Sequence, residues 1–128
     1  MFAFACSSAG AQQYPRKPIT MIVGFPPGAA TDTFARVAGK RMSEVLGQQV
    51  IVINRDGAAG VIATDQVARA APDGYTVLWG SASALAILPA SGKKLPFDPQ
   101  RDLEPVSLAA KISYMLVTHP SVPAANLK

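Results

Sequence analysis

The chain has 128 residues, of which 49% are hydrophobic and 16% charged, a composition typical of globular proteins rather than disordered or fibrous ones. Twelve Lys and Arg against eight Asp and Glu leave a net charge of +4, which suits an anionic ligand or solubility and lies far below the clustered charge of nucleic-acid-binding proteins. One Cys and one His exclude an internal disulfide and any site that needs a second Cys or His. We therefore expect at most one domain, with no metal, cofactor or nucleic acid.

Residues 1–13 resemble the end of an export signal. The segment begins with apolar and small residues, and Ala9-Gly10-Ala11 before the polar Gln12-Gln13 is similar to a signal-cleavage site. The usual charged start is missing, and a chance run of small residues is the alternative. We predict a remnant of an export signal, with Cys6 in the segment that is removed, or else a disordered N-terminus.

The first predicted elements are a strand and a helix. Ile19 to Val23 is a continuous apolar run of strand length, closed by Gly24 and a double proline. From Asp32 apolar residues recur at helical spacing, and Gly47 ends the pattern. Thr31 or Asp32 is placed to cap this helix. Its predicted buried face consists of Phe34, Val37, Ala38, Met42, Val45 and Leu46.

The alternation of strand and helix then repeats along the chain. Residues 50–53 are a second apolar run, residues 54–60 a turn-rich loop, residues 61–71 a second helix and residues 75–79 a third strand. Strands and helices joined in this order by short connections predict an α/β fold, with a mainly parallel sheet built from βαβ units and helices on both faces.

The uncharged run at residues 74–92 is long enough to suggest a transmembrane helix, but glycine, serine and proline interrupt it. It is more typical of a buried strand followed by a short helix over residues 81–88, so no membrane span is predicted. Proline-punctuated chain from Leu95 leads to apolar segments at residues 106–109 and 114–118. Residues 119–128 have the composition of a linker.

Three loops at the carboxyl ends of the predicted strands form the candidate binding site, because ligands of open α/β sheets bind there. The loops at residues 25–32, 55–60 and 80–84 are rich in Gly, Ala or Ser. At least two lead into helix N-termini, whose free N–H groups favour a carboxylate or phosphate. Turn geometry alone explains each loop equally well, and neither a P-loop nor a dinucleotide fingerprint is present. Their convergence predicts an anion site.

Several polar residues have two possible roles each. Ser81 and Ser83 are placed to donate hydrogen bonds to a ligand or to cap the next helix. Arg55 is suited to binding a carboxylate or to a solvated surface position. His119 has no second His or Cys to form a dyad, and we expect it to be structural. No nucleophile stands with a base.

Five collinear segments carry a resemblance to a known family: YPRKPITMIVGFPPGAATDTFAR, VINRDGAAG, APDGYTVLWGS, LPFDPQRDLEPVSL and LVTHPSVPA. From about Tyr14 to its end the chain resembles the Bug-type receptors, the extracytoplasmic solute-binding components of tripartite tricarboxylate transporters. The resemblance implies a non-enzymatic periplasmic receptor whose two α/β lobes close on a small carboxylate and which serves membrane permease subunits. Carried over, the ligand-binding residues are Phe25, Pro26, Pro27, Gly28, Ala29, Ala30, Thr31, Asp32, Ser81, Ala82, Ser83 and Ala84.

Family members are longer than this chain, so the resemblance implies a truncated receptor. We expect residues 14–118 to form the first lobe, and residues 119–128 to lead toward a second lobe that is absent. The chain departs from the family at Ala29, Ala59 and Ala63, where glycine is usual, at Asp56, where proline is usual, and at Leu85 and Leu88, where polar residues are common. A methyl group at Ala29 would hinder close backbone approach to a ligand.

Two alternatives stay open. One is a small α/β enzyme acting on an acidic metabolite through Asp32 or Ser83. The other is a non-functional fragment of an interrupted gene.

Overall fold

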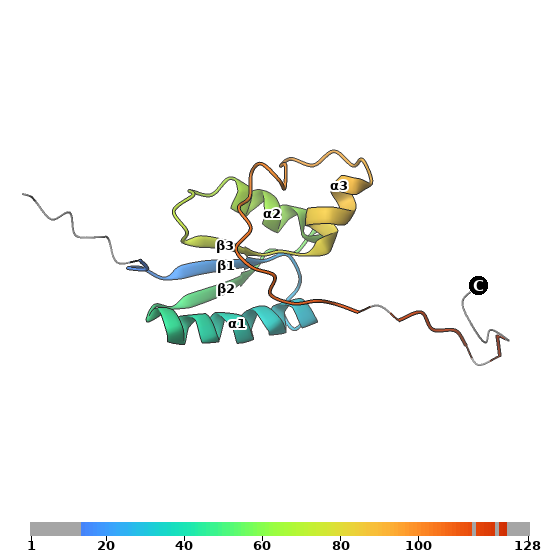
Figure 1. The fold of residues 1–128 in the computed structure, drawn as a ribbon, viewed down its shortest axis with the longest axis horizontal. Coiled ribbons are helices and arrows are strands. Elements are labelled where there is room, and N and C mark those ends of the chain that lie inside the picture. The colour runs from blue at the N-terminus through green and yellow to red at the C-terminus, as the bar shows by residue number, and fades with distance from the viewer. Residues whose placement is uncertain (1–13, 114, 120, 123–128) are drawn as a thin grey trace, which may run out of the picture.

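The computed structural model describes residues 14–113, 115–119 and 121–122. They form a three-layer α/β lobe in which α1 covers one side of a parallel sheet while α2 and α3 lie on the other (Figure 1). The sheet has the strand order β2-β1-β3, which confirms the predicted fold class. In chain order the elements are β1 (Ile19–Val23), α1 (Ala30–Leu46), β2 (Val50–Asn54), the 3₁₀ turn η1 (Ala58–Gly60), α2 (Val61–Ala68), β3 (Thr76–Trp79), the π-helical turn η2 (Ser83–Ile87) and α3 (Leu88–Ala90).

The predicted apolar run at β1 is the centre of the sheet. Ile19 is aligned with Val50 of β2, and Thr20 is aligned with Thr76 of β3. Because β1 has a strand on each side and helices on both faces, all its residues except Thr20 are buried. A core of Met21, Val23 and Ala35 is completed by the partly buried residues Met42, Val50, Val52, Val77 and Trp79.

The predicted buried face of α1 is wrong. Phe34 and Val45 are 58% and 68% exposed, whereas Ala35 and Gly39 are buried against the sheet. A Cβ added to Gly39 would lie 3.3 Å from Val52 Cγ2. The small residues therefore face the sheet because helix and sheet approach closely there, and the bulkier apolar residues turn outward. Of the predicted face, Met42 packs against the core.

Helix ends also differ in part from the prediction. Ala29 is the N-cap of α1 and its side chain makes no capping hydrogen bond, so the prediction that Thr31 or Asp32 caps the helix is wrong; both lie in its first turn. Gly47 ends α1 with φ of 66°, as expected for a C-terminal glycine. Helix α2 stops at Ala68, three residues earlier than predicted.

The uncharged run at residues 74–92 folds as predicted into a strand, β3, followed by the short helical segment of η2 and α3. In the described part of the chain, no helix has the length and hydropathy required to cross a bilayer. Residues 103–113 and 115–118 have no regular secondary structure. The predicted export signal at residues 1–13 lies outside the described residues, as does most of the predicted linker.

The start of the described chain is attached to the turn that precedes β3. Tyr14 donates its hydroxyl to Gly74 O at 2.6 Å, and Lys17 forms an ion pair of 3.2 Å with Asp73. The Lys17 ammonium also lies 4.3 Å from the centroid of the Tyr75 ring. These contacts fix the amino ends of the strands, opposite the edge where the candidate site lies.

Candidate functional site

The three predicted loops meet at Gly60. A Cβ added to Gly24, the residue after β1, would lie 2.7 Å from Gly60 Cα, so the two backbones are in direct contact. A Cβ added to Gly60 would lie 3.3 Å from Ser81 Oγ and 3.8 Å from Phe25 Cε2. The loops that follow β1, β2 and β3 are therefore packed together, and glycine is required where no side chain fits between them.

The carboxylate of Asp32 holds the first loop in place. Oδ2 accepts hydrogen bonds from Gly28 N at 2.9 Å and Arg36 Nε at 3.0 Å, while Oδ1 accepts one from Asn54 Nδ2 at 2.9 Å. The Asn54 amide also donates to Phe25 O at 2.9 Å. Hydrogen bonds from Arg36, Gly28 and Asn54 lower the pKa of Asp32 to about 2.

This network excludes a free carboxylate at Asp32 and changes the role expected of its side chain. Asp32 is 3% exposed, and both oxygens of its carboxylate already accept hydrogen bonds. An acid with such a low pKa is also a poor general base at neutral pH. The side chain of Asp32 therefore positions the loop, and its partner is Asn54. Sequence reasoning missed Asn54, whose only signal is its polarity at the end of an apolar strand.

The two longer helices that begin at this edge have no side-chain caps. The N-cap residues Ala29 of α1 and Gly60 of α2 make no capping side-chain bond. In the described part of the chain, the first three N–H groups of α1, at residues 30–32, have no hydrogen-bond acceptor. Unpaired N–H groups and the positive end of a 17-residue helix together attract anions.

The other predicted site residues divide between the surface and the interior. Ser81 Oγ accepts a long hydrogen bond of 3.4 Å from Ala84 N, so this hydroxyl helps to order the start of η2, the capping role that we considered. Ala84 is fully buried and lies below the loop surface. Exposed positions are Pro26, Pro27, Gly28, Ala30 and Ala82; half-buried positions are Phe25, Ala29, Thr31, Ser81 and Ser83.

The second loop has a left-handed backbone that the sequence did not predict. Ala58 and Ala59 have φ of 49° and 57°, a region that costs a residue with a Cβ about 1–2 kcal/mol. The flanking glycines, Gly57 and Gly60, have φ of 134° and 92°. Arg55 N donates to Val23 O at 2.7 Å, which fastens the loop to the end of β1, and the Arg55 side chain is exposed.

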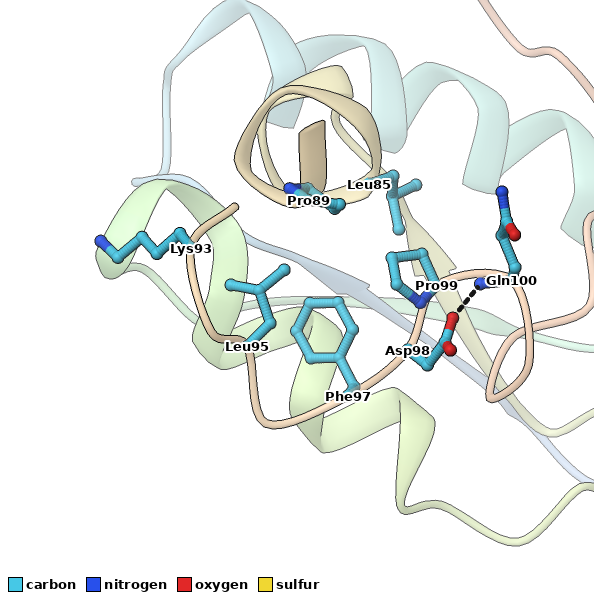
Figure 2. Close-up of a pocket in the computed structure, with 8 residues that line it drawn as sticks. All are labelled: Leu85, Pro89, Lys93, Leu95, Phe97, Asp98, Pro99 and Gln100. Atoms are coloured by element: carbon cyan, nitrogen blue, oxygen red, sulfur yellow. Dashed lines mark hydrogen bonds between the residues drawn. The ribbon is translucent and has the colours of Figure 1, made fainter. Parts of the chain in front are cut away.

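An open groove of about 420 Å³ lies apart from these loops. Figure 2 shows Leu85 and Pro89, from η2 and α3, facing the segment that carries Leu95, Phe97 and Pro99. None of the predicted site residues lines this groove. It is therefore a separate feature of the outer helical layer.

The catalytic role considered for Ser83 has no supporting partner among the described residues. Ser83 makes no hydrogen bond to an acid or a base in the described part of the chain, and a nucleophilic serine needs such a partner. The described residues also contain no cluster of three or more His, Cys, Asp or Glu side chains that could hold a metal ion. Binding through backbone N–H groups is what the arrangement supports.

Solved structures define the class of protein. The lobe matches MatC from Rhodopseudomonas palustris with bound malate at a TM-score of 0.66 and 37% identity, over 70% of this chain and 30% of that one. A structure described as a periplasmic transporter matches at a TM-score of 0.64 and 48% identity, over 67% of this chain and 29% of that one. The fold is therefore that of a lobe of a periplasmic binding protein.

The sequence comparisons identify the family. Residues 34–128 match the model of the tripartite tricarboxylate transporter family receptor. Protein BugT of Bordetella pertussis is 46% identical over 118 residues, which are 91% of this chain and 36% of BugT. The chain belongs to this receptor family, as its sequence motifs predicted, and it spans about a third of the length of the curated relatives that it matches.

Proposed function

We propose that this chain contributes the first lobe of a periplasmic solute-binding receptor, which captures a small carboxylate and delivers it to the permease subunits of a tripartite tricarboxylate transporter. The observation that carries the proposal is that three packed loops lie at one edge of a parallel sheet, and that two of them lead into helices, α1 and α2, without side-chain caps. Such an edge presents partial positive charge and hydrogen-bond donors to a carboxylate. Membership of the receptor family supports the same role.

In this proposal the ligand carboxylate accepts hydrogen bonds from the free N–H groups at the start of α1 and from the hydroxyls of the third loop. Asp32 takes part through its backbone N–H, while its carboxylate keeps the loop in shape through Gly28 and Asn54. The buried Ala84 supports the third loop from below. The contacts come from the loops formed by Phe25, Pro26, Pro27, Gly28, Ala29, Ala30, Thr31 and Asp32, and by Ser81, Ala82, Ser83 and Ala84.

The proposed ligand class is a small dicarboxylate. MatC, with which the lobe shares its fold and 37% of its aligned residues, was solved with malate bound. Hydrogen bonds that stay open to water on one side contribute little net free energy. Tight binding in this proposal therefore requires a second lobe that closes over the ligand, by the hinge motion typical of such receptors.

A single backbone N–H can be removed to test the site. Ala30 is the first residue of α1, where proline is tolerated, and Ala29 before it has φ of −64° and ψ of 158°, a conformation compatible with a following proline. Ala30→Pro deletes one free N–H while the helix is kept. Ala30→Val, which adds bulk but keeps the N–H, is the matched control.

Binding of malate, citrate and adipate would be measured by isothermal titration calorimetry on the two-lobed receptor that contains this lobe, with the neutral diamide of malate as a further control. Loss of one hydrogen bond to a charged group, worth about 1.5 kcal/mol or more in the closed receptor, predicts at least about tenfold weaker binding in Ala30→Pro and little change in Ala30→Val. Equal affinity of Ala30→Pro and the unmodified receptor, or equal binding of the diamide, would contradict the proposal.

A further inference from the structure

A buried negative charge lies at the edge where the proposed ligand carboxylate binds. Asp32 is in the first turn of α1, the turn whose free N–H groups the proposed function assigns to the ligand. The residue is 3% exposed and its pKa is lowered to about 2, so its carboxylate is ionised at neutral pH. Water screens a buried charge poorly. Asp32 therefore repels a ligand carboxylate unless a positive charge offsets its own.

Arg36 supplies that positive charge from the next turn of α1. Its Nε donates to Asp32 Oδ2 at 3.0 Å, and its Nη2 lies 3.0 Å from Asp32 Oδ1. This bidentate geometry fixes the position of the guanidinium against both carboxylate oxygens. Among the described residues, Arg36 is the only charged side chain that forms an ion pair with Asp32.

Asn54, at the end of β2, keeps the guanidinium of Arg36 in this position. Arg36 Nη2 donates to Asn54 Oδ1 at 2.9 Å, and Asn54 Nδ2 donates to Asp32 Oδ1 at 2.9 Å. The three side chains thus form a closed ring of hydrogen bonds between α1 and β2. The Arg36 side chain is 50% exposed, but the ring distinguishes its ion pair from the isolated surface pairs that contribute little.

We propose that Arg36 is a positioning residue for ligand binding, whose charge cancels that of Asp32 and so allows the free N–H groups of α1 to attract a carboxylate. The inference rests on the proposed receptor function, because it concerns the same site. The start of a helix carries about half a unit of positive charge. With Arg36 in place this partial charge dominates, whereas the full negative charge of an unpaired Asp32 would exceed it and reverse the sign of the site.

The expected effect is large because the charges are close together. Asp32 shares one helical turn, with a pitch of about 5.4 Å, with the N–H groups at residues 30–32. A carboxylate bound to these groups is therefore roughly 5–10 Å from the Asp32 carboxylate. At an effective dielectric constant of about 20, repulsion between two unit charges at that separation weakens binding by at least about tenfold.

The test is the affinity for malate, measured by isothermal titration calorimetry on the two-lobed receptor that contains this lobe. Arg36→Gln removes the charge but keeps a hydrogen-bond donor for Asp32, and should bind malate at least about tenfold more weakly. Arg36→Lys keeps the charge but loses the planar fork that joins Asp32 to Asn54. Because charge is the property that matters in this proposal, Arg36→Lys should stay within about threefold of the unmodified receptor.

Two further variants separate the charge of the pair from its contribution to structure. Asp32→Asn combined with Arg36→Gln removes both charges and leaves an amide oxygen for the Gly28 N–H, so affinity should return to within about threefold of the unmodified receptor. Arg41→Gln is the matched control, because Arg41 pairs with Glu44 on the same helix and its side chain is 75% exposed. It follows residue 30 by about 16 Å along the helix, beyond the range of screened charges, and its loss should leave the affinity unchanged. Circular dichroism would check that each variant is folded.

The outcomes distinguish this inference from the proposed function. If Ala30→Pro binds malate as well as the unmodified receptor does, the site itself is wrong and the role of Arg36 is refuted with it. If Ala30→Pro weakens binding but Arg36→Gln does not, the role of Arg36 alone is refuted. Equal losses in Arg36→Gln and Arg36→Lys, no recovery in the double variant, or an equal loss in Arg41→Gln would each overturn charge compensation.

Discussion

Replacing Ala59 by glycine should stabilise the chain. Ala59 has φ of 57° and ψ of 33°, a left-handed conformation that costs an L-residue with a Cβ about 1–2 kcal/mol. Glycine adopts it freely but loses more backbone entropy on folding, about 0.5–1 kcal/mol. Because Ala59 is exposed, removal of its methyl group sacrifices little packing. The free energy of unfolding of Ala59→Gly should therefore rise by about 0.5–1 kcal/mol.

The assay is equilibrium unfolding in urea, followed by circular dichroism, together with thermal melting. A gain of about 0.5–1 kcal/mol corresponds to a rise in Tm of about 2–4 °C for a chain of this size. Ala38→Gly is the matched control, because Ala38 lies inside α1 and glycine in a helix interior costs about 1 kcal/mol. Each substitution removes one alanine methyl group, and the two should change the free energy of unfolding in opposite directions.

If Ala59→Gly destabilises the chain as much as Ala38→Gly does, the second loop does not hold Ala59 in a left-handed conformation in solution. An increase in stability for both variants would also contradict the prediction, because glycine raises the entropy of the unfolded chain and should lower the stability of a helix interior.

Two more predictions concern the loops of the candidate site. Gly24→Ala places a Cβ 2.7 Å from Gly60 Cα, so the first two loops must separate, and stability should fall by about 1–3 kcal/mol in urea unfolding; an unchanged midpoint would show that the loops are not in contact. Asp32 has its pKa lowered from 3.8 to about 2, so its carboxylate stabilises the fold above pH 3.8 and this contribution is lost as the pH falls toward 2. The stability difference between the unmodified chain and Asp32→Asn should therefore shrink over that interval, measured by urea unfolding at several pH values. A stability difference that stays constant with pH would contradict the Asp32 network. The pKa values of Asp73 and Asp102 are also lowered, chiefly by hydrogen bonds from Tyr75 N–H and Asp98 N–H respectively. Both residues are present in both proteins, so their pH dependence cancels in the difference.

The strands and the order of elements could be predicted because their signals are local. The apolar run of β1 has the length of a buried strand and its predicted bounds are those observed. Gly47 marks the end of α1 because a left-handed residue at that position needs no Cβ. The loops of the candidate site were located for the same reason, since each follows directly from the end of a strand.

The orientation of α1 could not be predicted, because two apolar faces compete in its sequence. Phe34, Val37 and Val45 form the more hydrophobic stripe, yet Ala35 and Gly39 face the sheet. The contact of Gly39 with Val52 decides the outcome, and Val52 belongs to another element. Helical periodicity contains no information on how closely the helix approaches that neighbour.

The sequence by itself determined the α/β class, the strand order along the chain and the family, because these follow from local apolar patterns, glycine positions and collinear motifs. Tertiary structure decided which groups meet: that Asp32 binds Gly28 and Asn54 rather than standing free, and that the three loops touch at Gly60. The physical reason is that hydrogen bonding and close packing depend on distances between segments far apart in the chain, and only the folded sheet brings those segments together.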